Sequence, residues 1–216
     1  MKNLLKLFSI LQLTKEQPLT GYVLGGLKSS ELPSLAEHHF TTALTGYFLT
    51  HRILDEGGDI DQNKVVVMSL IHDLSELFGG DVAGPLNRKY PDLREYKDKI
   101  GQRAIDLLCE YMDQASHDEF KTFWDELSDG KTDESIVVKI VDQMDHQLFL
   151  EHHNFKGKYD PGYTDYRPSF INDHVFTLTS KISDSVTKDV MNDFLKTFKD
   201  QFFNKGFQAM NIMMED

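Results

Sequence analysis

Residues 65–77 place the strongest constraint on the fold, because this segment is apolar on nearly every side of a helix. A helix of that kind must be buried by other elements, so we predict a central helix over residues 63–78. Other segments repeat the helical spacing of apolar residues, and no alternating run is long enough for a sheet. The sequence therefore predicts an all-α fold, a single helical bundle of about six to eight helices.

Further helices are expected at about 2–13, 34–56, 93–112 and 132–153, with a short one around Trp124 and a last one over 183–210. In the second helix, apolar spacing predicts one buried face: Phe40, Ala43, Leu44, Tyr47, Phe48, His51 and Leu54. The aromatic-rich stretch that follows Asn154 is interpreted as an ordered connection. We expect residues 1–154 to form the core and residues 155–216 a C-terminal helical extension packed on the same domain.

Composition excludes several classes of protein. The chain has 35 acidic and 23 basic residues among 216, a net charge of −12, whereas general nucleic-acid binders cluster Lys and Arg. Cys109 is the one cysteine, so an internal disulfide is excluded and a reducing, cytoplasmic location fits. No apolar stretch reaches the roughly 18 residues of a membrane span. Apolar residues near the C-terminus either pack back on the domain or form the seam of a homodimer.

The pair His72-Asp73 lies in the middle of the predicted apolar helix. Burying a carboxylate there costs several kcal/mol unless another group compensates it, and a metal ion is a good compensator. Glu76 follows one helical turn later, on the same face, so it is free to act as an acid or base near such an ion. These residues predict a metal site with an acidic neighbour.

Two ligands are too few for an ion, and the sequence offers more. One histidine can come from the start of the second helix, where His38 and His39 compete. One aspartate can come from the helix over 132–153, where Asp142 competes with Asp145. Such a mixed nitrogen and oxygen set suits one divalent ion of Mn, Co, Ni, Fe, Zn or Mg.

The order His38, His72-Asp73, Asp142 resembles the H…HD…D signature of the HD-domain metal-dependent phosphohydrolases. The nearer resemblance is to the small branch of bacterial 5′-deoxynucleotidases and oxetanocin-resistance-type phosphohydrolases. Three motifs carry it, and together they cover about residues 1–153: Glu37-His38, then H-D-x-x-E at 72–76 with G-D at 80–81 and Pro85, then V-K-x-x-D at 138–142.

The resemblance implies that His38, His72, Asp73 and Asp142 ligate the ion. It further implies that Glu76 and Asp81 position or deprotonate the attacking water, or protonate the leaving oxygen.

Substrate contacts are expected from two places. Many members carry a Pro-Arg-Thr-Gly-Trp-like segment before the second helix, and here it reads P-L-T-G-Y at 18–22. Leu19 and Tyr22 thus stand at the Arg-like and Trp-like positions as substrate-binding candidates. Arg88 is a further candidate, because a guanidinium can grip a phosphate with two hydrogen bonds.

The implied function is a phosphomonoesterase that hydrolyses nucleoside 5′-monophosphates with a metal-bound water, and its partner is a small phosphorylated substrate. Two alternatives remain open. The first alternative is a phosphodiesterase or pyrophosphohydrolase that acts on another nucleotide. The second is a sensor that binds metal and nucleotide without turnover.

Overall fold

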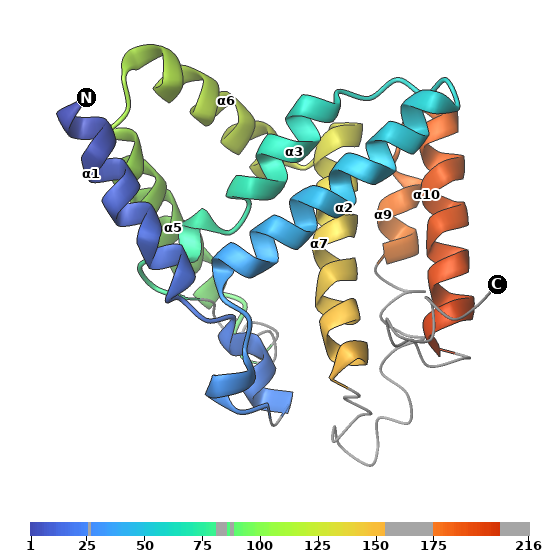
Figure 1. Cartoon of the computed structure of the whole chain (residues 1–216), viewed down its shortest axis with the longest axis horizontal. Coiled ribbons are helices and arrows are strands. Elements are labelled where there is room, and N and C mark those ends of the chain that lie inside the picture. The colour runs from blue at the N-terminus through green and yellow to red at the C-terminus, as the bar shows by residue number, and fades with distance from the viewer. Residues whose placement is uncertain (26, 81–85, 87–88, 154–174, 204–216) are drawn as a thin grey trace. The chain divides into compact units, whose positions relative to one another are not determined.

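The structure is a computed structural model that describes residues 1–25, 27–80, 86, 89–153 and 175–203 (Figure 1). These residues form eight α-helices and no strand, which confirms the all-α prediction. The helices are α1 (Lys2–Leu11), α2 (Leu35–Asp55), α3 (Gln62–Ile71), α5 (Leu93–Cys109), α6 (Gln114–Asp129), α7 (Asp133–His152), α9 (Phe176–Ser180) and α10 (Ser185–Phe198). None of the described helices is long and apolar enough to cross a bilayer.

The chain divides into two compact units. The first unit comprises Met1–Thr41 and Leu70–Asp125, and the second comprises Thr42–Ser69 and Glu126–Asp216. The first unit contains α1, the first turns of α2, α5 and most of α6. The second contains the rest of α2, most of α3, and α7, α9 and α10.

In the first unit, the core is built mainly from α5 and the segment that follows α3. Ile105 and Leu108 of α5 are fully buried, and Leu74 and Leu77 are buried as well. Helix α1 contributes Leu7 to the core. The helix predicted around Trp124 is longer than expected, because α6 runs over 16 residues whose polar majority weakens the apolar pattern.

The second unit is organised around α7, which buries residues on several sides, among them Ile136, Ile140 and Met144. Its first turn is capped by the Thr132 side chain, which accepts a hydrogen bond from the Ser135 amide. Helix α9, which the sequence interpretation did not anticipate, lies between α7 and α10 (Figure 1). Helix α10 continues as a π-helical turn, η6 (Lys199–Phe203), and the rest of the predicted helix over 183–210 lies outside the described residues.

The predicted buried face of α2 is wrong. Of that set only Ala43 is buried, while Phe40, Leu44, Tyr47, Phe48, His51 and Leu54 are exposed. Within the second unit, α2 instead buries the small residues Gly46 and Thr50. A Cβ on Gly46 would lie 3.0 Å from the Val65 side chain, so α2 and α3 pack too closely there for large side chains. Close packing, which hydrophobicity does not report, decides which side of α2 is buried.

The prediction of one helix over 63–78 is also wrong, because α3 ends at Ile71. Residues 72–73 form a turn in which Asp73 leaves the α region, with φ −109° and ψ 13°. A 3-10 turn, η4 (Leu74–Glu76), follows, and the Asp73 carbonyl accepts a hydrogen bond from the Glu76 amide. Leu74 and Leu77 are buried here, as they would be in a helix that continued to residue 78. The spacing of apolar residues therefore does not distinguish a turn followed by a 3-10 turn from a longer α-helix.

Candidate metal centre

The start of α2 is fixed by a reciprocal pair of hydrogen bonds. The Glu37 carboxylate accepts from the Ser34 amide at 2.7 Å, and the Ser34 hydroxyl accepts from the Glu37 amide at 3.3 Å. This arrangement is a capping box, which satisfies amides that a helix start leaves without partners. Glu37, part of the acid-His pair in the sequence, thus sets the helix start that places His38 in the first turns.

The segment that carries Leu19 is held against the same helix start. Pro18 and Ser34 form an isolated antiparallel bridge. The Leu19 amide donates to the Pro33 carbonyl at 3.0 Å, and the Leu35 amide donates to the Gln17 carbonyl at 2.9 Å. The substrate-binding segment expected from the resemblance therefore lies beside the helix start that carries His38.

His38, His72 and Asp73 come together in the first unit, and their donor atoms all lie within 4.8 Å of one another. The His38 Nε2 and His72 Nε2 atoms are 3.0 Å apart. The Asp73 Oδ2 atom lies 3.4 Å from His72 Nε2 and 3.8 Å from His38 Nε2. The turn at 72–73 allows this, since it directs two adjacent side chains toward one histidine of α2.

These distances fit a divalent ion. Histidine nitrogens and carboxylate oxygens bind such ions at about 2.0–2.2 Å, so neighbouring ligands of one ion lie about 3.0–3.4 Å apart. His38 is buried, and the side chain of Asp73 keeps about a quarter of its surface exposed, which leaves a route for ligands from solvent. The two imidazoles and the carboxylate match the mixed donor set expected from the sequence.

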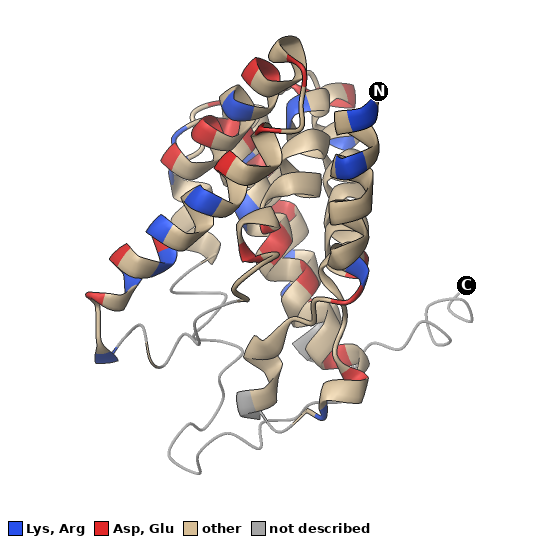
Figure 2. Cartoon of the chain, turned by 90° about the vertical axis from the view of Figure 1, so that its left-hand side faces the viewer, with Lys and Arg blue, Asp and Glu red and all other residues tan. Residues whose placement is uncertain are grey.

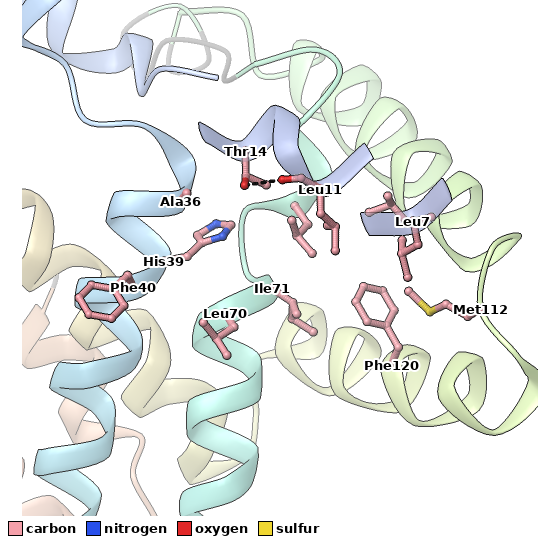
Figure 3. A pocket seen from close by; sticks show the side chains of 12 residues that line it. Leu7, Leu11, Thr14, Ala36, His39, Phe40, Leu70, Ile71, Met112 and Phe120 are labelled. Atoms are coloured by element: carbon pink, nitrogen blue, oxygen red, sulfur yellow. Dashed lines mark hydrogen bonds between the residues drawn. The ribbon is translucent and has the colours of Figure 1, made fainter. Parts of the chain in front are cut away.

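His39 does not belong to this group of donor atoms, although its ring centroid lies 4.9 Å from that of His72. It reaches from α2 into an apolar pocket of about 420 Å³ (Figure 3). The pocket is lined by Leu7, Leu11, Thr14, Ala36, His39, Phe40, Leu70, Ile71, Leu74, Leu108, Met112 and Phe120. Of the two neighbouring histidines, His38 is therefore the one whose Nε2 meets that of His72.

Asp142 lies on α7 in the second unit, and its surroundings there are polar. Its Oδ1 is 3.1 Å from Nε2 of His146, one helical turn later, and its Oδ2 accepts a hydrogen bond from Gln143 at 2.9 Å. The contact between His146 and Asp142 is not among the contacts that we predict from the sequence. The competing residue, Asp145, shares this helix.

Glu76 is buried in η4, three residues after Asp73. Its Oε1 lies 3.0 Å from the Nζ atom of Lys97 on α5, a pairing that no motif in the sequence predicts. Asp81 and Arg88 lie outside the described residues. The backbone just before Asp81 turns at Gly80, whose φ of 66° favours glycine and whose amide donates to the Glu76 carbonyl at 2.8 Å.

Leu19 and Tyr22, the substrate-binding candidates, are both buried, with 5% and 8% of their surface exposed. Each therefore contributes to packing in the first unit.

Figure 2 shows acidic and basic residues interspersed along the helices in view, a pattern typical of solvated helix faces.

Comparison with known proteins places the chain. The family model that matches is described as HD domain, and it covers residues 15–174. The 5′-deoxynucleotidase HDDC2 of Dictyostelium discoideum is 30% identical over 147 residues, which are 67% of this chain and 74% of that protein. The 5′-deoxynucleotidase YGK1 of Saccharomyces cerevisiae is 29% identical over 108 residues, and the match spans only 44% of its length.

Solved structures share the fold. A predicted metal-dependent phosphohydrolase from Magnetospirillum magnetotacticum MS-1 has a TM-score of 0.63 at 18% identity, covering 96% of this chain and 95% of that one. The PH0347 protein of Pyrococcus horikoshii OT3 has a TM-score of 0.64 at 20% identity, covering 89% and 96%. The family model covers most of the chain, and one 5′-deoxynucleotidase is 30% identical to it. The chain therefore belongs to the HD-domain phosphohydrolase family and is related to 5′-deoxynucleotidases.

Proposed function

We propose that this chain is a divalent-metal-dependent phosphomonoesterase that hydrolyses nucleoside 5′-monophosphates, with deoxynucleotides as the preferred class. The observation that carries the proposal is the convergence of His38, His72 and Asp73 on one point. The substrate class is supported by relatives named as 5′-deoxynucleotidases, one of which this chain matches over 74% of its length.

Four residues are proposed to hold one ion: His38, His72, Asp73 and Asp142. Asp142 is included because V-K-x-x-D at 138–142 resembles the motif that carries the last ligand in the family. When bound, the ion would polarise a phosphoryl oxygen and lower the pKa of a coordinated water. Two imidazoles and two carboxylates leave room for water and substrate on an ion with five or six ligands.

Glu76 is proposed as the acid/base residue, with Asp81 as its partner. A phosphomonoester is hydrolysed when water oxygen bonds to phosphorus and the bond from phosphorus to the leaving oxygen breaks. One group must accept the proton of the water, and the leaving oxygen must receive one. A buried carboxylate three residues from Asp73 is suited to moving the first of these protons.

Substrate recognition is proposed for the segment with Leu19 and Tyr22 and for Arg88. The bridge between Pro18 and Ser34 supports the first part, since it holds this segment at the start of the helix that carries His38. Because both side chains are buried, we expect them to hold the backbone of this segment in place and not to contact a phosphate directly.

The proposal is tested by phosphate release from a panel of ribo- and deoxynucleoside 5′-monophosphates. Protein stripped of metal is assayed with Mn, Co, Ni, Mg, Fe or Zn added back singly. Metal-dependent release of orthophosphate from a monophosphate supports the proposal. A nucleoside monophosphate as product, formed from a diester or a pyrophosphate, would replace it with the phosphodiesterase alternative. Metal binding without any hydrolysis would favour the sensor.

A further inference from the structure

The buried carboxylate of Glu76 has a cationic neighbour that belongs to another helix of the first unit. Lys97 Nζ lies 3.0 Å from Glu76 Oε1, and the two side chains keep 33% and 10% of their surface exposed. Other ion pairs on α5 differ from this one. Lys99 pairs with Glu95, one turn away on the same helix, and both side chains are about two-thirds exposed.

Close packing explains why Lys97 reaches Glu76. Gly101 lies one helical turn after Lys97 on the same side of α5. A Cβ on Gly101 would lie only 2.9 Å from the Cβ of Ser75, the residue before Glu76. A Cβ on Gly79 would lie 3.2 Å from the side chain of Ile100. Helix α5 therefore packs directly on η4 and on the turn after it, and this contact fixes the distance between Lys97 and Glu76.

We infer that Lys97 is a positioning residue for the hydrolytic reaction: its ammonium group holds the Glu76 carboxylate in the orientation that proton transfer requires. The inference rests on the proposed function, in which Glu76 is the acid/base residue. Glu76 lies in a 3-10 turn of three residues, in which the backbone hydrogen-bond geometry is poorer than in an α-helix. A contact between charged groups from a neighbouring helix holds its carboxylate more strongly than a contact between neutral groups would.

Kinetics of three variants test the inference. Lys97→Ala is expected to lower kcat by about 10- to 100-fold, the size of effect that follows from misplacing a catalytic group. KM and bound metal should stay close to wild type, because the ion pair joins Lys97 to Glu76, which is not one of the four proposed metal ligands. Lys97→Arg should recover most of the rate, since it restores a cation. Lys99→Ala is the matched control on α5 and should behave as wild type.

A second measurement does not depend on turnover. The melting temperatures of Glu76→Gln, Lys97→Met and the double variant form a double-mutant cycle. If the pair is formed, the double variant loses clearly less than the sum of the two single losses. Additive losses would overturn the inference, as would a wild-type kcat in Lys97→Ala. If wild-type protein hydrolyses no phosphate ester, the proposed function fails, and the cycle alone decides whether Lys97 anchors Glu76.

Discussion

Replacing Gly101 by alanine should destabilise the first unit, although alanine is the better helix former. The added methyl would lie 2.9 Å from the Ser75 Cβ, an atom attached directly to the backbone that cannot rotate away. Overpacking of this kind costs about 1–3 kcal/mol, and the gain in helix propensity returns about 0.8–1.0 kcal/mol. The net loss is about 0–2 kcal/mol, with the centre near 1 kcal/mol.

In a chain of 216 residues, a loss of 1 kcal/mol lowers the melting temperature by about 2–4 °C. The assay is thermal unfolding followed by circular dichroism, with Gly21→Ala as the control. No atom lies within 4 Å of a Cβ built on Gly21, so that variant should be neutral or slightly stabilised. A Gly101→Ala protein that melts above wild type would show that propensity outweighs packing and would refute the close contact between α5 and η4.

Four further predictions concern single side chains. Asp73→Ala should lose both its bound metal, measured by elemental analysis, and its turnover. A metal content equal to that of wild type would show that Asp73 is not a metal ligand. Glu76→Gln should keep the metal but lower kcat by about 10²-fold, and an unchanged kcat would exclude it as the acid/base residue. The pKa of Asp184 is held below its usual 3.8 mainly by the backbone amide of Thr187. Its contribution to stability is therefore present above that pH and is lost as pH falls through the lower folded pKa, so the melting-temperature gap between wild type and Asp184→Ala should narrow in acid; a constant gap would contradict this. Burial raises the pKa of the Cys109 thiol, so a thiol reagent should label it only after unfolding, and fast labelling of native protein would show that it is exposed.

Part of the group formed by His38, His72 and Asp73 could be singled out from the sequence because the chemistry of its residues marks them. A histidine and an aspartate in the most apolar segment are costly unless something compensates them, so His72 and Asp73 stand out without a structure. The same reasoning gave the wrong local geometry. It placed both residues inside a helix, whereas a turn brings them to His38. Hydropathy reports burial, and burial is the same for Leu74 and Leu77 in either geometry.

The packing of α2 and the partner of Glu76 could not be predicted for related reasons. Helix α2 turns small residues such as Gly46 toward α3, and a search for large apolar residues selects the opposite side. Lys97 is one of many lysines in the sequence, and only the packing of Gly101 on Ser75 gives it a special neighbour. Both features depend on distances between elements, which a single sequence does not contain.

The most direct test of the account is to locate a bound divalent ion. Crystals of the protein soaked with manganese or cobalt, measured at the absorption edge of the metal, would show the ion by anomalous scattering. We expect one strong peak about 2.0–2.2 Å from Nε2 of His38 and His72 and from carboxylate oxygens of Asp73 and Asp142. An ion bound only at other residues, or no ion at millimolar metal, would contradict the proposed metal centre and the reaction that depends on it.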